Sequence, residues 1–255
     1  MVKLAYLIPL FPLFSFIILI FFGKKLGHKS ALVAIGASLL SLLTSVPFIL
    51  GTLRGEIYLH EFEWLTTFPP LGAGMSPPLA GAMSASLKFG ILIDPLSAMM
   101  LFVVTFIGTL IIIYSVGYMH EDPRFSRFFA YLSLFMASML NLVISSNFIM
   151  FYMSWELVGL CSYLLIGFWF EKNSAANASK KAFITTRVGD VSFFLGLLLL
   201  FFTIGSLNIK DLNHDFLHAF SQESGKLTLA GLLIFGGAVG KSAQFPLHVW
   251  LPDAM

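Results

Sequence analysis

Long apolar stretches dominate the sequence, and the short breaks between them carry nearly all of the charged residues. A helix needs about 20 apolar residues to cross the hydrocarbon core of a bilayer. Seven stretches come close to this length, with approximate bounds 4–22, 31–53, 91–118, 128–144, 148–170, 183–204 and 227–243. The pattern therefore predicts an all-α polytopic membrane protein with seven transmembrane helices.

The lysines and arginines in the breaks indicate how these helices are oriented. Short loops dense in these cations face the cytoplasm or its equivalent. The short, densely charged breaks on one side hold Lys24, Lys25, Lys29, Arg124, Arg127, Lys172, Lys180 and Lys181. We therefore expect the N-terminus outside and the segment after the seventh helix inside.

Two longer breaks fall on the predicted outer side. Residues 54–90 include four prolines, which predicts an irregular or hairpin-containing cap over the helices. Residues 205–226 are polar and are expected to form a loop. Their His214 and His218 have the spacing of a metal-binding pair, but a wet loop without a third ligand favours an ordinary loop.

Composition narrows the function classes. Hydrophobic residues make up 58% of the chain and charged residues 11%, against about 25% charged in soluble domains, which excludes a soluble enzyme and a disordered chain. A net charge of +2 gives no sign of the basic patch that nucleic-acid binding requires. The single cysteine, Cys161, excludes an internal disulfide, an iron–sulfur cluster and a structural zinc site. Neither paired histidines for haem within the spans nor a dinucleotide fingerprint is present, so redox cofactors belong on other chains.

Charged residues inside the predicted spans are informative, because each one at the centre of a membrane helix costs about 2.5–3.5 kcal/mol on insertion scales. Glu156 lies midway along the fifth span with no cation three or four residues away, so its partner must come from another helix, unless it is a protonated hydrogen-bonding group. Lys241 follows a glycine-rich segment and precedes Pro246, which predicts a helix broken beside a buried lysine. The alternative is that Lys241 extends to the inner interface.

Three further charges have local interpretations. Arg187 and Asp190 lie three residues apart on one face of the sixth span, so a structural ion pair is an alternative to a functional role. Asp94, followed by Pro95, is expected to cap the third span.

A buried acid and a buried base suggest a proton switch. Two unit charges about 4 Å apart attract by about 4 kcal/mol at an effective dielectric near 20. A buried lysine that loses its carboxylate partner can release its proton near neutral pH. We hypothesise that Glu156 modulates and that Lys241 carries the proton.

Several motifs in the chain resemble one known family. They are SRFFAY at 126–131, WE at 155–156, GLCSYLLIGF at 159–168, KAF at 181–183, RVGD at 187–190 and GGAVGKSAQ at 236–244. The sequence resembles the antiporter-like proton-translocating subunits of NADH-quinone oxidoreductase, of the subunit L or complex I chain 5 type. The match extends over about 94–255, and over the first ninety residues in helix pattern only.

The resemblance implies a role for each buried charge. It places the family's essential glutamate at Glu156, its broken-helix lysine at Lys241 and a functionally sensitive aspartate at Asp190, with Arg187 in support. It also implies partners in a membrane arm, especially neighbouring antiporter-like subunits. NADH, FMN, iron–sulfur clusters and quinone are expected on partner subunits, and no cofactor or metal on this chain.

Family members are longer than this chain, so the resemblance implies the first part of an antiporter-like fold and one half of a proton path. Residues 1–90 would hold two helices and an extracytoplasmic loop, and 91–255 a truncated antiporter-like domain. The expected location is the bacterial plasma membrane or, alternatively, an organellar inner membrane. The large subunit of a multi-subunit sodium/proton antiporter and a purely structural membrane subunit remain alternatives.

Overall fold

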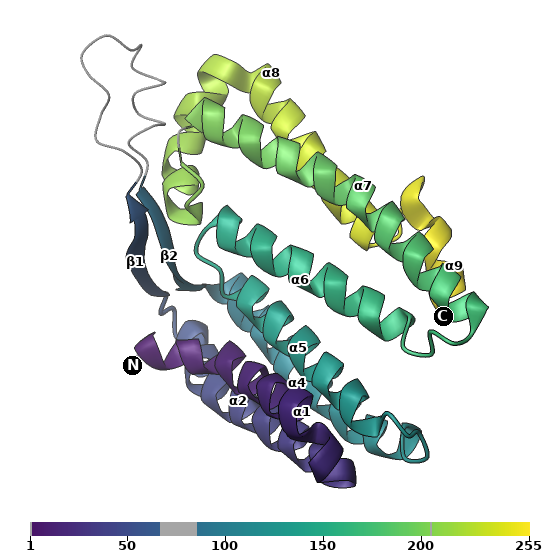
Figure 1. Cartoon of the computed structure of the whole chain (residues 1–255). Coiled ribbons are helices and arrows are strands. Elements are labelled where there is room, and N and C mark those ends of the chain that lie inside the picture. Colours follow the sequence, from purple (N-terminus) through teal and green to yellow (C-terminus); the bar gives the residue numbers. More distant parts are fainter. Residues whose placement is uncertain (1, 67–85, 205) are drawn as a thin grey trace. The chain divides into compact units, whose positions relative to one another are not determined.

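The computed structural model describes the backbone of residues 2–66, 86–204 and 206–255 (Figure 1), and within them all side chains except those of 64–66, 86–87, 211 and 213–223. The long helices are α1 (Leu7–Leu26), α2 (Ser30–Leu53), α4 (Pro95–Tyr118), α5 (Phe125–Val143), α6 (Phe148–Ile166), α7 (Asn173–Ile204) and α8 (Ile209–Lys241). Strands β1 (Tyr58–Thr66) and β2 (Ser86–Ile93) pair in a two-stranded sheet. The short elements are η1 (Val2–Tyr6), η2 (Gly27–Lys29), η3 (Leu247–Trp250) and α9 (Leu251–Ala254).

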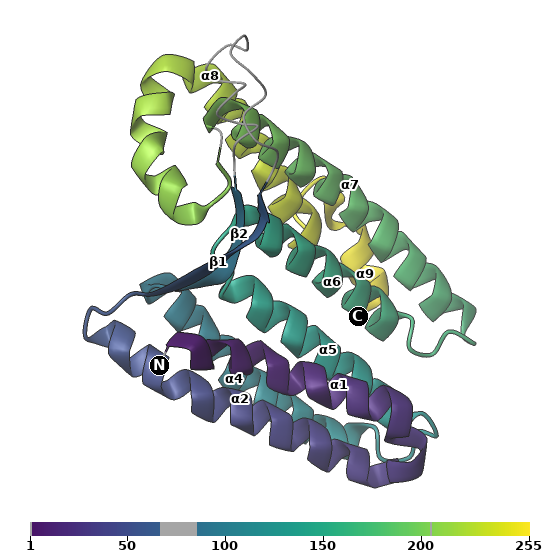
Figure 2. The same ribbon diagram turned by 60° about the vertical axis from the view of Figure 1, so that its left-hand side comes forward.

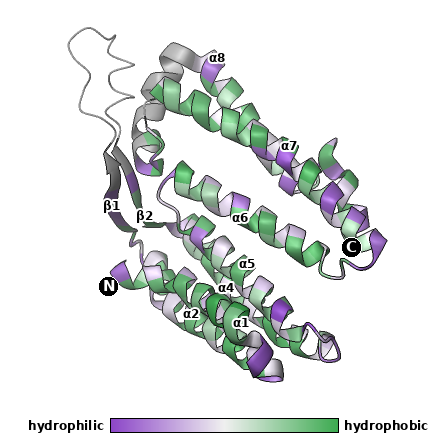
Figure 3. Cartoon of the chain, viewed as in Figure 1, coloured by the Kyte–Doolittle hydropathy of each residue, from purple (hydrophilic) through white to green (hydrophobic). Residues whose placement is uncertain are grey.

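The described residues contain five segments that are long and apolar enough to cross a membrane. They are Val2–Leu53, Pro95–Tyr118, Phe125–Val143, Phe148–Ile166 and Asn173–Ile204, and the first holds both α1 and α2. Figure 3 shows how strongly hydrophobic residues dominate these helices, and many of their large apolar side chains are exposed. An exposed apolar surface of this kind is typical of a chain that contacts lipid or protein partners within a membrane. The polytopic membrane fold is confirmed, while the count of seven crossings stays a prediction.

The start of the third predicted span is a strand rather than a helix. Residues 91–93 belong to β2, and α4 begins only at Pro95. The backbone N–H of Ser97 donates a hydrogen bond to Asp94 Oδ1 at 2.7 Å, which confirms Asp94 as the N-cap. The third helix was predicted to start too early, because an isoleucine-rich segment suits a strand as well as a helix.

The polar segment before the last helix was wrongly predicted to be a loop. Helix α8 starts at Ile209, so it includes residues 209–226, although the side chains of His214 and His218 lie outside the described set. Likewise α7 begins at Asn173, ten residues before the predicted span. A helix continues past its apolar stretch because its backbone hydrogen bonds do not depend on side-chain polarity. In the predicted cap, the two paired strands agree with a hairpin-containing segment, and residues 67–85 lie outside the described residues.

The chain forms two compact units. The first comprises Met1–His60, Ile91–Ser145 and Met153–Phe168, and the second comprises Glu61–Gly90, Ser146–Tyr152 and Trp169–Met255. The predicted division at residue 90 stays a prediction. In the first unit, α1 packs against α2 and α5, and α2 packs against α4.

Small residues let α1 approach α5 in the first unit. The Ser126 hydroxyl donates a hydrogen bond to the Gly23 carbonyl at 2.8 Å, and a Cβ on Gly23 would lie 2.9 Å from Ser126 Cβ. Further along the same pair, Ser15 and Ser133 share a hydrogen bond of 3.2 Å. Membrane helices associate through such close packing and interhelical hydrogen bonds, since lipid provides no hydrophobic drive between them.

The second unit is built on α7 and α8, which run side by side in both views (Figures 1 and 2). Glycines line their contact. A Cβ on Gly196 would lie 2.8 Å from the backbone nitrogen of Ile234 and 2.9 Å from the carbonyl oxygen of Ala230. The Ser192 hydroxyl also donates to the Leu233 carbonyl at 2.8 Å. The two backbones are thus nearly in contact.

Replacing Gly196 with alanine should separate the two helices. We expect Gly196→Ala to lower the free energy of unfolding by about 1–3 kcal/mol, because the added methyl group meets backbone that cannot rotate away. Gly231→Ala, in α8, is the matched control, since nothing lies within 4 Å of its Cβ position. It should not destabilise the protein, because alanine favours helix over glycine. Denaturant unfolding in mild detergent, followed by circular dichroism, measures both, and equal stability of the two variants would contradict the packing argument.

Candidate functional site: a buried lysine–aspartate pair

An ion pair joins α7 to the end of α8 in the second unit. Lys241 Nζ lies 3.6 Å from Asp190 Oδ2. The Asp190 side chain is 2% exposed and that of Lys241 16% exposed, and the lysine Nζ itself is buried. Low solvent exposure strengthens the attraction between such charges and raises the cost of leaving either one alone. The pair is therefore a linked acid and base inside the helical unit.

The glycines beside each charge explain why the two meet. Gly189 precedes Asp190 and Gly240 precedes Lys241. A Cβ on Gly240 would lie 3.1 Å from Gly189 Cα, and one on Gly189 would lie 3.0 Å from both Gly240 Cα and the Gly236 carbonyl oxygen. Any larger residue would push the helices apart. Backbone contact at this level thus fixes the separation of the two charges.

Lys241 is the last residue of α8, as the predicted helix break requires. The Ser242 N–H donates to the Ala238 carbonyl at 2.9 Å, and the Gln244 N–H donates to the Val239 carbonyl at 3.0 Å. Between them Ala243 has φ 49°, a left-handed conformation usually taken by glycine. The partial negative charge of the helix C-terminus favours a cation at this position.

Two aromatic residues complete the surroundings of the helix end and of Asp190. The Trp250 indole N–H donates to the Gly240 carbonyl at 3.1 Å, so one terminal carbonyl of α8 is satisfied from η3. The Tyr152 hydroxyl donates to the Asp190 carbonyl at 3.4 Å, and its ring meets Phe193 edge-on at 5.5 Å. These contacts hold the backbone on both sides of the ion pair.

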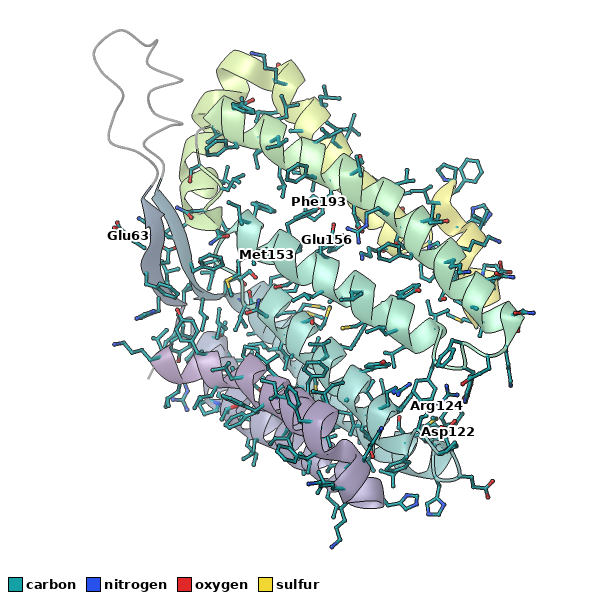
Figure 4. The ribbon with its side chains drawn as sticks, in the orientation of Figure 1. Glu63, Asp122, Arg124, Met153, Glu156 and Phe193 are labelled. Atoms are coloured by element: carbon teal, nitrogen blue, oxygen red, sulfur yellow. The ribbon has the colours of Figure 1, made fainter. Side chains whose placement is uncertain are left out.

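The structure does not test every role that the sequence suggested. Arg187 lies with its guanidinium over the Phe183 ring at 4.7 Å, and its local pairing with Asp190 stays a prediction. Glu156 lies in α6, in the first unit (Figure 4), and its Oε1 is buried. Two residues before it, the Ser154 hydroxyl accepts a 2.7 Å hydrogen bond from the Asn141 side chain. The interaction of Glu156 with Lys241 also stays a prediction.

Sequence reasoning missed the Asp190–Lys241 pair. It considered only Arg187 for Asp190, because the two are three residues apart, and only Glu156 for Lys241. A usable signal was present in Gly189, Gly236 and Gly240, whose spacing allows close helix contact. Among the described residues, no group of three histidine, cysteine, aspartate or glutamate side chains is arranged to hold a metal ion.

The second unit of this polytopic membrane protein therefore consists of closely packed helices, one of which ends at a buried lysine that pairs with a carboxylate. Comparison with known proteins shows the family. Residues 145–255 match the family described as NADH:quinone oxidoreductase/Mrp antiporter, TM, and residues 80–129 match NADH-Ubiquinone oxidoreductase (complex I), chain 5 N-terminus. The chain belongs to this family of antiporter-like subunits, which confirms the resemblance found in the sequence.

Two relatives extend the similarity to nearly the whole chain. F(420)H(2) dehydrogenase subunit L of Methanosarcina mazei is 44% identical over 99% of this chain and 38% of its own length. The chloroplastic NAD(P)H-quinone oxidoreductase subunit 5 of Zygnema circumcarinatum is 45% identical over 91% of this chain and 31% of its own. The similarity therefore includes most of the first ninety residues, and the chain spans about a third of the length of these relatives.

Solved structures share the fold. An archaeal membrane-bound sulfane sulfur reductase chain superimposes with a TM-score of 0.74 at 18% identity, covering 98% of this chain and 47% of that one. A chain of the Mrp complex from Dietzia sp. DQ12-45-1b gives 0.78 at 20% identity, covering 98% and 25%. At these identities the likeness extends to the fold alone.

The left-handed residue at the end of α8 generates a stability prediction. We expect Ala243→Gly to stabilise the protein by about 1 kcal/mol, because glycine adopts this conformation without a side-chain clash. Ala238→Gly is the matched control within the helix and should destabilise by a similar amount, about 1 kcal/mol. Denaturant unfolding compares them, and a shift of both variants in the same direction would contradict this account of the helix end.

Proposed function

We propose that this chain is part of a proton-translocating membrane subunit of an NADH-quinone oxidoreductase of the complex I type. Partner subunits would carry NADH, FMN, iron–sulfur clusters and quinone, and neighbouring membrane-arm subunits would flank this one. The observation that carries the proposal is the buried Asp190–Lys241 pair at the end of α8, inside the segment that matches the family. The names of the two relatives support the same class of complex.

The proposed mechanism depends on competition for Asp190. While the aspartate stays beside Lys241, the lysine keeps its proton, because its positive charge is stabilised at 3.6 Å. If another cation attracts Asp190 away, Lys241 loses this stabilisation and releases its proton. Arg187, one turn before Asp190 on the same helix, is our candidate for that competing cation. Glu156 would modulate the switch from α6.

The energy of the ion pair is similar in size to the energy needed to move a proton across the membrane. An ion pair about 4 Å apart is worth about 4 kcal/mol at an effective dielectric near 20. Moving one charge across 100 mV of membrane potential costs about 2.3 kcal/mol. One such pair is thus strong enough to hold or release a proton against a typical potential, and the net free energy would come from quinone reduction on partner subunits. The membrane would be the bacterial plasma membrane or an organellar inner membrane.

Neutralising the pair should stop proton movement. In the assembled complex reconstituted into vesicles, we expect Lys241→Ala and Asp190→Asn each to lower the ratio of the rate of proton uptake to the rate of quinone reduction at least tenfold, which corresponds to about 1.4 kcal/mol on the barrier to proton transfer. Lys226→Ala is the control, because it removes an exposed lysine from the same helix. Glu156→Gln should lower the same ratio if it modulates the switch.

The conservative variants separate function from assembly. Lys241→Arg and Asp190→Glu keep the charges and should retain more uptake than the neutral variants. Normal coupling in a correctly assembled Lys241→Ala complex would overturn the proposal and favour a purely structural role for the pair.

A second candidate function is the large subunit of a sodium/proton antiporter. The description of the matched family names Mrp antiporters, and the Dietzia Mrp chain shares the fold. A sodium pulse given to the vesicles without an electron donor distinguishes the two functions. Proton movement that follows the pulse favours the antiporter, and movement that requires NADH and quinone favours the redox-driven subunit.

A further inference from the structure

A cationic cavity lies at one end of the first unit, whereas the Asp190–Lys241 pair belongs to the second unit. It has a volume of about 320 Å³ and forms where α1 turns into α2 and where α4 is connected to α5. Lys24 at the end of α1 and His28 in η2 line one side of it, and Asp122, Arg124 and Arg127 line the other side from the connection and the first turn of α5. None of these residues takes part in the proposed proton path.

The cavity carries an excess of positive charge. Its single carboxylate, that of Asp122, is already engaged, because it accepts the Arg124 backbone N–H at 2.7 Å and lies 4.0 Å from Arg124 Nε. Lys24 and Arg127 add two exposed cations. The first turn of α5 begins here and contains no acidic residue, so the positive end of that helix adds to the field.

The Arg124 side chain is held in position before any ligand binds. The Arg124 side chain is 20% exposed, and its guanidinium lies over the Phe168 ring at 5.2 Å from the ring centre. Figure 4 places Arg124 and Asp122 together at the connection between α4 and α5. A guanidinium fixed by a carboxylate and an aromatic ring loses little freedom when it binds an anion.

Exposed aromatic residues on α1 and α4 favour a position of the cavity at the depth of lipid headgroups. Tyr114 and Tyr118 lie on the last turns of α4 with exposures of 74% and 60%. Phe21, which is 76% exposed, lies about one turn before Lys24 on α1. Exposed tyrosine rings are typical of the boundary between the hydrocarbon core and the headgroups. We therefore expect a phosphate group that binds at this depth to come from a lipid headgroup rather than from a dissolved anion.

We propose that this cavity binds the phosphate group of an anionic membrane lipid, with Arg124 as the fixed anchor and Lys24 and Arg127 as the exposed cations around it. Basic pockets between membrane helices bind anionic headgroups through the same chemistry. The site is independent of the proposed proton path, so either proposal can fail without the other.

Lipid binding by the full chain tests the proposal. The protein is purified in neutral detergent and titrated with phosphatidylglycerol, and bound lipid is counted by native mass spectrometry. Lys24→Gln with Arg127→Gln should weaken binding roughly thirty-fold, the loss expected for two basic side chains at an anionic surface. Lys25→Gln with Lys29→Gln is the matched control, because it removes two cations that do not line the cavity. It should leave binding unchanged.

Three further binding measurements identify the ligand and exclude damage to the fold. Lys24→Arg with Arg127→Lys keeps the charge and should keep the affinity. Phosphatidylcholine with the same acyl chains should bind weakly, because its headgroup has no net charge. Displacement of phosphatidylglycerol by an equal concentration of inorganic phosphate would overturn the lipid assignment in favour of a solute anion. Equal binding by the cavity variant and its control would overturn the site itself.

Discussion

The backbone contact between α7 and α8 at Gly189 and Gly240 is the constraint on which the second unit depends. Lipid offers no hydrophobic drive for helices to associate, so they are held by close packing and interhelical hydrogen bonds. The glycines permit the packing, and the hydrogen bond from Ser192 to the Leu233 carbonyl reinforces it. The same contact brings Asp190 within 3.6 Å of Lys241. Stability and chemistry thus share one feature of the fold.

Stability alone gives a weak reason for keeping the buried ion pair, which favours a functional one. Removing two charges from water often costs as much as their attraction returns, and well-packed apolar residues are frequently more stable in their place. The helix end adds a second cost, since Ala243 is held in a left-handed conformation. A buried charge and a left-handed residue within three positions of each other are typical of a site where strain and charge serve a function.

The errors in the predicted elements have a common physical origin. Hydropathy marks where side chains leave the hydrocarbon core, whereas a helix ends where its backbone hydrogen bonds end. Helices α7 and α8 therefore extend through polar residues that looked like loops. The apolar residues 91–93 lie in a strand because a paired strand also satisfies its backbone. Asp94 was predicted correctly because an N-cap is a local hydrogen bond that depends on residues close in sequence.

The sequence by itself determined the membrane class, most of the helices, the break after Lys241 and the family, since each depends on local composition or on motifs. It also identified Glu156, Arg187, Asp190 and Lys241 as charges that require an explanation. Only the tertiary structure decided that Asp190 and Lys241 are partners, although they lie 51 positions apart in the sequence. Local spacing relates a residue only to neighbours on its own helix. Which residues face each other across two helices depends on their register, which the glycine contacts fix in three dimensions.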